Sequence, residues 1–341
     1  MGLLEHLYAK IFIAIIEDGE RIDIATQVIS GGKKDDDFQS FESLEELKSY
    51  IQDLLGESPY YYISLLNNCS DQGALPTCDK LKMRDFADVS LSVSLCMDKK
   101  WALYSSSGLL QALEKRHQSY GLDYIFSPFT ILHHFFKDKI KEVLGLYVLI
   151  QNESLCIAVF SQEKLEFGMY VVTDADEIAL TQNSLESSGG FEAGLDEVED
   201  EIDFDDLSVL DDIEALDDIE SLDDIETLDD MDSIESFEDF AEESDILSIE
   251  EPDANDEESI EGFNLDFYRF TLIQEALKKF YSDDAYESVF IEAVFIADAV
   301  GIGQDLKSYL EEELFVTPIV RKINLSKSLL ELTKDEVAHA S

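Results

Sequence analysis

The strongest limit on the fold of this chain comes from residues 174–261. They hold 38 Asp and Glu residues and no Lys or Arg, and four hexapeptides beginning Leu-Asp-Asp follow one another from Leu210. Their apolar residues recur at every third position, which winds an apolar stripe fully around a helix of about 3.6 residues per turn. Because unbalanced Asp pairs also oppose compaction, we expect residues 174–262 to be an acidic, low-complexity, mostly disordered insertion with LDDIE hexapeptide repeats.

The charge of the chain excludes a class of partners. Lys and Arg total 24 against 77 Asp and Glu, a formal net charge of -53. Such a surface repels phosphate backbones and anionic lipid head groups, so nucleic-acid binding is not expected. Outside residues 174–261 there remain 39 acidic and 24 basic residues, an ordinary balance for a soluble protein. The flanking segments, long enough for two domains, therefore build the fold.

The cysteines and the apolar runs indicate a compartment. Cys69, Cys78, Cys96 and Cys156 form no CxxC pair, and we expect them to be buried, reduced thiols. The first residues lack the basic and apolar regions of a secretory signal. No stretch approaches the roughly 20 apolar residues of a membrane span. We therefore predict a cytoplasmic protein that reaches the membrane only through a partner.

The first part of the chain has the pattern of a mixed α/β lobe. Apolar runs predict a buried hairpin at residues 11–16 and 22–29, and Ser43 with Glu46 forms a capping box that opens a helix over 44–55. Further strands are predicted at 60–66, 89–95, 101–104 and 122–126, helices at 109–120 and 128–143, and loops at 33–37 and 67–76.

The second part repeats this order more clearly. It predicts strands at 145–151, 154–160 and 165–172, then a helix at 265–281, a strand at 289–297, a helix at 304–314 and a strand at 317–323. Duplicated halves of this type normally form two lobes around a cleft.

The common catalytic signatures are missing from the sequence. There is no GxxxxGK[ST], GxGxxG, GxSxG or HExxH motif. The histidines, which are His6, His117, His133, His134 and His339, have no carboxylate or Cys cluster at ligand spacing beside them. We therefore expect no catalytic residue and no metal site, and surface or core roles for these side chains.

Three stretches resemble the PilM proteins and the cytoplasmic domain of the GspL proteins, within the actin-like ATPase superfamily. Residues 146–167 resemble the second phosphate hairpin of that family, 290–319 its adenosine strand, turn and helix, and 121–129 the end of its first lobe. The resemblance implies an α/β, bilobal, actin-like (ribonuclease H-like) fold. Its first lobe would span 1–144 and its second 145–173 with 263–325, leaving 326–341 as a C-terminal tail.

The same resemblance implies which positions form a nucleotide pocket. They are Glu17, Asp18, Gly19, Asn152, Glu153, Ser154, Asp298 and Gly301. Asn152 and Glu153 stand where the family has Asp and Gly, and Asp298 with Ala299 replaces Gly-Gly. A carboxylate at Glu153 repels phosphate, and side chains occupy places where backbone amides must approach it closely. We therefore expect no cofactor, with ATP and magnesium disfavoured, and no hydrolysis.

The resemblance also implies a function. PilM-like proteins capture the short N-terminal tail of a PilN-like, single-pass inner-membrane protein. This chain would then be a scaffold at the inner face of the membrane, in a type IV pilus, a type II secretion system or an accessory assembly of a flagellar motor. The acidic insertion would engage basic surfaces of an assembly ATPase or a motor component.

Two alternatives remain open at this stage. The first is an active actin-like ATPase, including a membrane-associated filament former of the FtsA or MreB kind, in which residues 1–7 would be a membrane-surface helix. Alternatively, the second part would be an unrelated α+β interaction domain. Binding of ATP with magnesium separates the first alternative from a scaffold.

Overall fold

The computed structural model describes residues 8–19, 21–141, 143–173, 254–287 and 289–340. Contacts divide the chain into one unit of residues 1–187 with 254–341 and a second unit of residues 188–253. The second unit lies outside the described residues, as do the acidic repeats. Their predicted disorder and their predicted partner therefore stay predictions.

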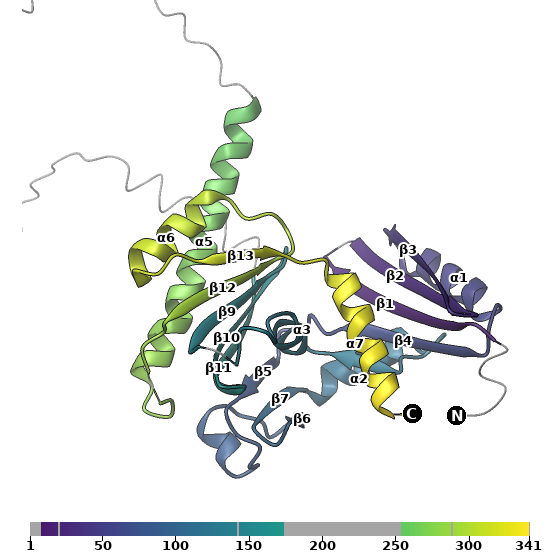
Figure 1. Ribbon diagram of the computed structural model, residues 1–341, viewed down its shortest axis with the longest axis horizontal. Coiled ribbons are helices and arrows are strands. Elements are labelled where there is room, and N and C mark those ends of the chain that lie inside the picture. Colours follow the sequence, from purple (N-terminus) through teal and green to yellow (C-terminus); the bar gives the residue numbers. More distant parts are fainter. Residues whose placement is uncertain (1–7, 20, 142, 174–253, 288, 341) are drawn as a thin grey trace, which may run out of the picture. The chain divides into compact units, whose positions relative to one another are not determined.

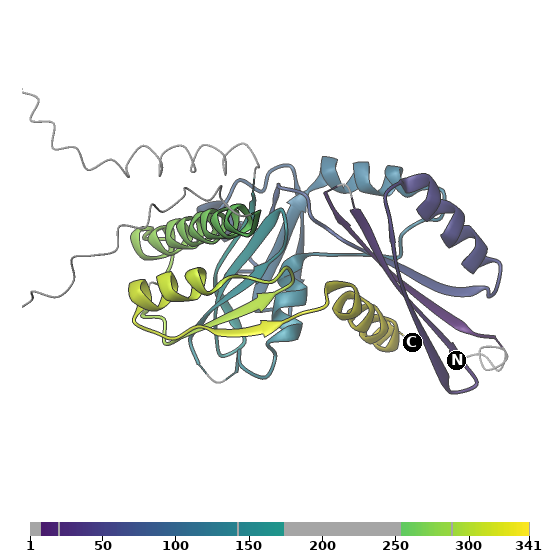
Figure 2. The ribbon, with the colours of Figure 1, turned by 90° about the horizontal axis from the view of Figure 1, so that it is seen from above.

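The first sheet is built around the hairpin that the sequence predicts. Its strands are β1 (Lys10–Asp18), β2 (Arg21–Ser30), β3 (Lys33–Phe41), β4 (Tyr60–Leu66) and β8 (Tyr124–Phe126), in the order β3-β2-β1-β4-β8. Side chains of β1 alternate between two buried clusters: Ile13 faces α1 (Leu44–Leu55), and Ala14 faces the opposite side. Figures 1 and 2 show α1 on one face of this sheet and α7 (Leu325–Ala340) on the other.

The second sheet repeats the topology of the first. Its strands are β9 (Gly145–Ile150), β10 (Ser154–Ser161), β11 (Lys164–Val172), β12 (Ala293–Asp298) and β13 (Ile319–Lys322), in the order β11-β10-β9-β12-β13. In the first sheet β2 is antiparallel to β1 and β3, and β4 and β8 run parallel to β1. In the second sheet β10 is likewise antiparallel to β9 and β11, and β12 and β13 run parallel to β9. This shared order confirms the predicted bilobal, actin-like, ribonuclease H-like fold. Helices α5 (Ala254–Ser282) and α6 (Gln304–Leu314) cover one face of the second sheet (Figure 2).

The residues between β4 and β8 form a third, small sheet. It contains β5 (Gln72–Leu75), β6 (Ser92–Met97) and β7 (Trp101–Ser106) in the order β5-β7-β6, with the short helix η1 (Lys82–Asp85) before β6 and α2 (Ser107–Arg116) after β7. Strand β5 lies against β11. A Cβ at Gly168 of β11 would approach the Ala74 carbonyl oxygen to 2.8 Å, so this contact requires glycine.

A central cluster joins the two large sheets to α3 (Pro128–Phe135) and α7. Trp101, Tyr147 and Phe160 are fully buried there, together with Leu329 of α7. The Thr333 hydroxyl of α7 lies 2.7 Å from the Ser64 hydroxyl of β4. Among the described helices, none is long and apolar enough to cross a membrane.

Two segments differ from the sequence expectation most clearly. Residues 33–37, predicted as a loop, belong to β3, an edge strand whose side chains are exposed on both faces and which therefore lacks an apolar pattern. Residues 326–341, predicted as a tail outside both lobes, form α7 as far as residue 340. This helix packs on β1, β2 and β4, because Leu329, Leu330 and Val337 need apolar cover.

Smaller differences concern element ends. The predicted loop 67–76 contains β5, and the helix predicted over 128–143 ends at Phe135 before a series of turns. Residues 254–262, placed in the insertion by the sequence, are the first turns of α5. The Ser43 half of the predicted capping box is confirmed, because the Glu46 amide donates to Ser43 Oγ at 3.3 Å.

The expectation of four reduced thiols is wrong for two of them. Cys78 and Cys96 form a disulfide with their Cα atoms 5.4 Å apart, although β7 lies between β5 and β6 in the sheet. Cys156 and Cys69 are free thiols, the first buried and the second half-buried.

Candidate functional site

The candidate nucleotide positions lie at the carboxyl ends of β1 in the first sheet and of the neighbouring strands β9 and β12 in the second. Glu17 and Asp18 end β1, Asn152 and Glu153 form the turn from β9 to β10, and Asp298 ends β12. Gly19 follows β1, Ser154 begins β10, and Gly301 lies in the turn after β12. The carboxyl edge of such strands is where α/β proteins normally bind ligands.

The first two turns contact each other directly. Asn152 Nδ2 donates to Asp18 Oδ2 at 2.5 Å. Gly19 has φ of +62°, and a Cβ there would overlap the Glu153 carboxylate. Burial raises the pKa of Asp18 from 3.8, partly offset by the Asn152 hydrogen bond, and the charge of Asp23 raises it further. Two carboxylates therefore stand at the place that phosphate would need.

The second turn is closed by its own hydrogen bonds. The Gln151 amide donates to the Ser154 carbonyl at 3.0 Å, and Gln151 Nε2 donates to Ser154 Oγ at 2.8 Å. The Thr173 amide donates to the Glu153 carbonyl at 2.7 Å. Because Ser154 is buried and its hydroxyl is engaged, it offers nothing to a ligand.

The third turn holds its own carboxylate. Asp298 Oδ1 accepts the amides of Val300 at 3.1 Å and Gly301 at 2.7 Å, and Oδ2 accepts the Ile302 amide at 3.1 Å. Asp298 is 4% exposed. Successive amides of this kind form an anion-binding concavity, and here a side chain of the same chain occupies it.

The free amides at the start of α6 are likewise bound by a carboxylate of the chain. Asp266 Oδ2 on α5 accepts the Leu306 amide at 3.3 Å, and Asp266 contacts Gly303 before the helix. Arg269 Nη1 lies 3.6 Å from Asp266 Oδ1. Burial raises the pKa of Asp266 and lowers that of Arg269. The sequence offered no direct signal for this cap, because α5 and α6 approach each other only in the fold.

These observations test whether ATP and magnesium fit the site. Phosphate binding needs free amides and glycine at the points of closest approach. The turn after β12 has its amides bound to Asp298, and Glu153 covers Gly19. The residues present therefore do not fit the magnesium nucleotide.

Glu17 is turned away from the other predicted residues. Its Oε1 lies 3.5 Å from Arg116 Nε and 3.3 Å from Nε2 of the fully buried His117. His117 Nδ1 also contacts the Tyr120 hydroxyl, whose pKa is raised by burial. The sequence did not connect these residues, since 99 positions separate Glu17 from Arg116.

A cavity of about 980 Å³ lies beside Gly19 at the end of the first sheet. Arg21 and Arg116 line it, which suggests an anion at first sight. Arg21 Nε, however, donates to Asp23 Oδ1 at 2.7 Å, and Arg116 is next to Glu17. Both guanidinium groups are thus balanced by carboxylates of the chain.

Edge strand β6 and the residue before it expose apolar side chains. Among the described strands it pairs only with β7, and Leu91, Val93 and Leu95 are 81%, 56% and 62% exposed. Val93 and Leu95 line a cavity of about 310 Å³ whose wall also includes Leu110 of α2. An exposed apolar edge strand is a ready template for another strand. The sequence showed its alternating pattern but not that the apolar side faces solvent.

Two family models match the chain. The model described as domain of unknown function DUF8341 matches residues 146–338, and the model described as domain of unknown function DUF8569 matches residues 8–133. Together they leave 134–145 between them, which comprises the end of α3, the connection that follows and the first residue of β9. No curated protein matches the chain.

Solved structures of other proteins are similar to the chain. In the PilM-PilN type IV pilus biogenesis complex, the similar chain has 10% identity, coverage of 93% of this chain and 89% of that one, and a TM-score of 0.46. Ethanolamine utilization protein EutJ from Carboxydothermus hydrogenoformans has 8% identity, coverage of 95% of this chain and 89% of that one, and a TM-score of 0.42. The activator of 2-hydroxyisocaproyl-CoA dehydratase from Clostridium difficile, with bound ADPNP, has 8% identity, coverage of 97% of each chain, and a TM-score of 0.39. At such scores the fold rests on the strand order of the two sheets.

Proposed function

We propose, for a chain that belongs to the family described as domain of unknown function DUF8341, a PilM-like scaffold function without ATP hydrolysis. It works in the cytoplasm and docks the N-terminal tail of a PilN-like, single-pass inner-membrane protein. The assembly is a type IV pilus, a type II secretion system or an accessory structure of a flagellar motor. The observation that carries the proposal is the Asp298 carboxylate, which holds the amides of Val300, Gly301 and Ile302.

Phosphate binding at the turn after β12, and with it hydrolysis, is disfavoured by free energy. A phosphate would have to displace Asp298 from its three amides and expose a buried carboxylate elsewhere. Hydrogen bonds to a charged group contribute about 1.5–3 kcal/mol each, so the exchange gives no net gain. The Glu153 carboxylate adds repulsion beside Gly19. An actin-like fold with its phosphate turns filled in this way is suited to holding a partner.

The edge strand β6 supports the docking part of the proposal. An extended tail can add to β6 through backbone hydrogen bonds and place side chains over Val93 and Leu95. Cytoplasmic flanks of membrane spans are enriched in Lys and Arg. Such a tail complements a chain of net charge -53, which also accelerates their encounter.

Site-specific crosslinking in cells tests the docking. The photoreactive amino acid benzoylphenylalanine replaces Val93, and a matched control places it at Phe290, which is also exposed but lies on a different surface. We expect capture of a single-pass membrane protein with a basic N-terminal tail from position 93 only. A synthetic peptide of that tail should then bind the intact protein, about tenfold more weakly after Val93→Asp. Equal capture at both positions contradicts docking on β6.

Calorimetry tests the second part of the proposal. The intact protein is titrated with ATP and magnesium up to about 1 mM, and no binding heat is expected. Tight, magnesium-dependent binding would instead support an active actin-like ATPase and overturn the scaffold proposal.

A further inference from the structure

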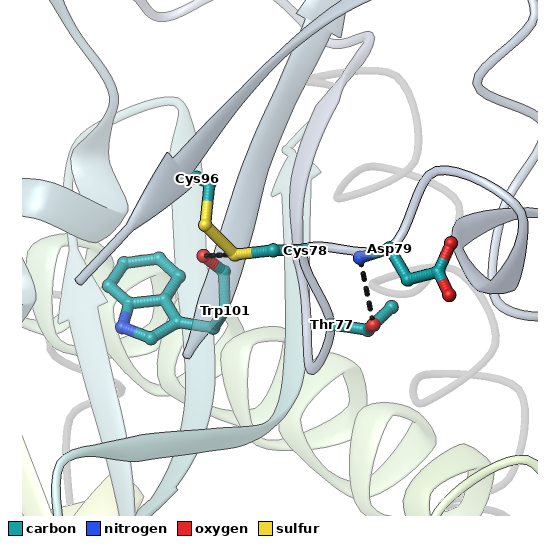
Figure 3. Close-up of a disulfide and its surroundings, with 5 residues drawn as sticks. All are labelled: Thr77, Cys78, Asp79, Cys96 and Trp101. Carbon is teal, nitrogen blue, oxygen red and sulfur yellow. Dashed lines mark hydrogen bonds between the residues drawn. A yellow bond between two sulfur atoms is a disulfide. The ribbon is translucent and has the colours of Figure 1, made fainter. Parts of the chain in front are cut away.

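The Cys78–Cys96 disulfide lies on the strand where docking is proposed, so the inference below rests on the proposed function. Cys96 belongs to β6, and Cys78 to the segment after β5, 18 positions earlier. Figure 3 shows the two sulfur atoms beside Trp101, and Cys78 Sγ lies 3.1 Å from the Trp101 carbonyl oxygen. The bond thus attaches one end of the exposed edge strand to the other side of the small sheet.

The segment that the disulfide encloses is held mainly by short-range contacts. Between Asp79 and Val89 its backbone hydrogen bonds join near neighbours, such as the Met83 amide to the Asp79 carbonyl at 2.9 Å. Further on, the Leu91 carbonyl accepts the Ser107 amide at 3.0 Å, and β6 pairs with β7. Met83 is its one buried side chain, packed on Leu75 and Ala102, and the ring of the half-buried Phe86 contacts Tyr286 with centroids 5.3 Å apart. A segment with so few buried contacts opens easily unless a cross-link restrains it.

The two sulfur atoms differ in accessibility. Cys96 is exposed on the edge strand, whereas Cys78 is half-buried. By contrast, the free thiol of Cys156 is fully buried, and burial raises its pKa. A thiolate from solution can therefore approach the Cys96 sulfur, which is the first requirement for thiol–disulfide exchange.

We propose that Cys78 and Cys96 form a redox switch that controls docking on β6. A disulfide oxidant such as oxidised glutathione takes the two electrons that form the bond and is itself reduced to two thiols. The disulfide form holds β6 ready for the partner, and a cellular dithiol reductant releases it. One thiolate of the reductant attacks the Cys96 sulfur, and Cys78 leaves as a thiolate that takes a proton. The second thiol of the reductant then attacks the mixed disulfide, frees Cys96 as a thiol and leaves the reductant as a disulfide. Two electrons and two protons pass to the protein.

The disulfide affects how well β6 is ordered before the partner binds. In the disulfide form Leu95 and its neighbours are held in the sheet, so a partner has little further ordering to do. After reduction, residues 79–97 open more often. We expect their amide exchange to accelerate about 10- to 100-fold and the affinity for the tail to fall about tenfold.

The first experiment measures the bond and the opening on the intact protein. Peptide mapping without reductant, after treatment with oxidised glutathione, should find Cys78 joined to Cys96. Hydrogen exchange should then be faster at residues 79–97 in a thioredoxin-treated sample, and in Cys96→Ser, than in the oxidised protein. Cys69→Ser is the matched control, since it leaves the pair intact and should respond as the wild type does. Free thiols at Cys78 and Cys96 in the oxidised sample, besides those of Cys69 and Cys156, would overturn the switch and leave the docking proposal standing.

The second experiment measures docking in both redox states. The synthetic tail peptide of the membrane protein captured at position 93 is titrated into the oxidised protein, the reduced protein and Cys96→Ser. Weaker binding in the last two supports the switch. Equal binding in all three overturns the switch alone. Binding in none of them overturns the docking proposal, and with it the regulation of docking.

Discussion

Asn152 Nδ2 donates a hydrogen bond of 2.5 Å to Asp18 Oδ2, across 134 positions of the chain. The bond joins the hairpin turn of the first sheet to the corresponding turn of the second. Asp18 is half-buried, and burial raises its pKa from 3.8. Two of the positions that the sequence predicts for a nucleotide pocket are therefore used to hold the two turns together.

Asp18→Asn should stabilise the protein at neutral pH. The raised pKa means that the folded state binds the Asp18 proton more tightly than the unfolded chain does, so the free energy of unfolding falls as pH rises from 3.8 through that pKa. Asparagine keeps an acceptor for Asn152 and does not titrate. The variant should exceed the wild type by less than about 1 kcal/mol at about pH 7 and lose this advantage below about pH 4.

Urea unfolding over a range of pH measures this difference. The matched control is Asp35→Asn on β3, an exposed carboxylate that makes no such contact and should leave the pH profile unchanged. A gain for Asp18→Asn that is as large at acidic pH as at neutral pH would contradict the assignment of the effect to a desolvated charge.

Asp298→Ala should cost far more than a surface substitution. Three amides lose their acceptor in a buried turn, and each unsatisfied group costs about 1–3 kcal/mol, reduced where water enters. We expect a loss of about 2–4 kcal/mol by urea unfolding and a smaller loss for Asp298→Asn, which keeps one carbonyl oxygen. Asp305→Ala, in the first turn of α6, is the control and should change stability by less than about 1 kcal/mol. A loss no greater than in that control refutes the internal cap.

The sequence predicts the two sheets well because their central strands are apolar and are buried on both faces. Residues 11–16 and 145–160 illustrate this, and their order along the chain leads to the shared topology. Strand β3 is not predicted from the sequence because both of its faces are exposed to solvent, so it lacks an alternating apolar pattern.

The candidate site is predictable only as a set of positions. The sequence placed Asp298 in the third turn, but its capture of three amides depends on the turn geometry. The Asp18–Asn152 and Cys78–Cys96 pairs depend on contacts between distant segments, which no local pattern reports. Helix α7, by contrast, had a signal: Leu329, Thr333 and Val337 recur at helical spacing, and the Lys327 amide donates to the capping Asn324 side chain at 2.9 Å.

Truncation after residue 324 should abolish cooperative folding. It removes α7 and uncovers the central cluster, in which Leu329, Leu330, Leu332 and Val337 are buried. Each such side chain contributes about 1.5–3 kcal/mol, and their sum is comparable to the whole stability of a typical domain, about 5–15 kcal/mol. Circular dichroism melting measures the outcome, with Glu331→Ala on the exposed side of α7 as the control. A truncated protein that still melts cooperatively would show that these residues are a dispensable tail.

Thr333→Val tests the polar contact of the same helix. The Thr333 hydroxyl lies 2.7 Å from Ser64 Oγ and 2.8 Å from the Leu329 carbonyl oxygen, all within the core. Valine has nearly the same shape, so the substitution removes the hydrogen bond without a cavity, and we expect a loss of about 1 kcal/mol. Thr333→Ser keeps the hydroxyl and separates the two contributions, since its loss comes from the missing methyl group alone. Unchanged stability in Thr333→Val would mean that the buried hydroxyl adds nothing to the attachment of α7.

Replacing residues 174–253 with a flexible Gly/Ser linker should leave a folded body. The buried clusters of both sheets consist of described residues on either side of this segment, and α5 begins at Ala254. Linker length adds only a slowly growing entropy cost, about 0.6 kcal/mol for each doubling, so the melting temperature should stay within about 3 °C of the wild type. The tail peptide should still bind, because β6 lies in the retained part. Loss of cooperative melting would show that the acidic segment is needed for the fold, whereas loss of peptide binding alone would place part of the docking surface within it.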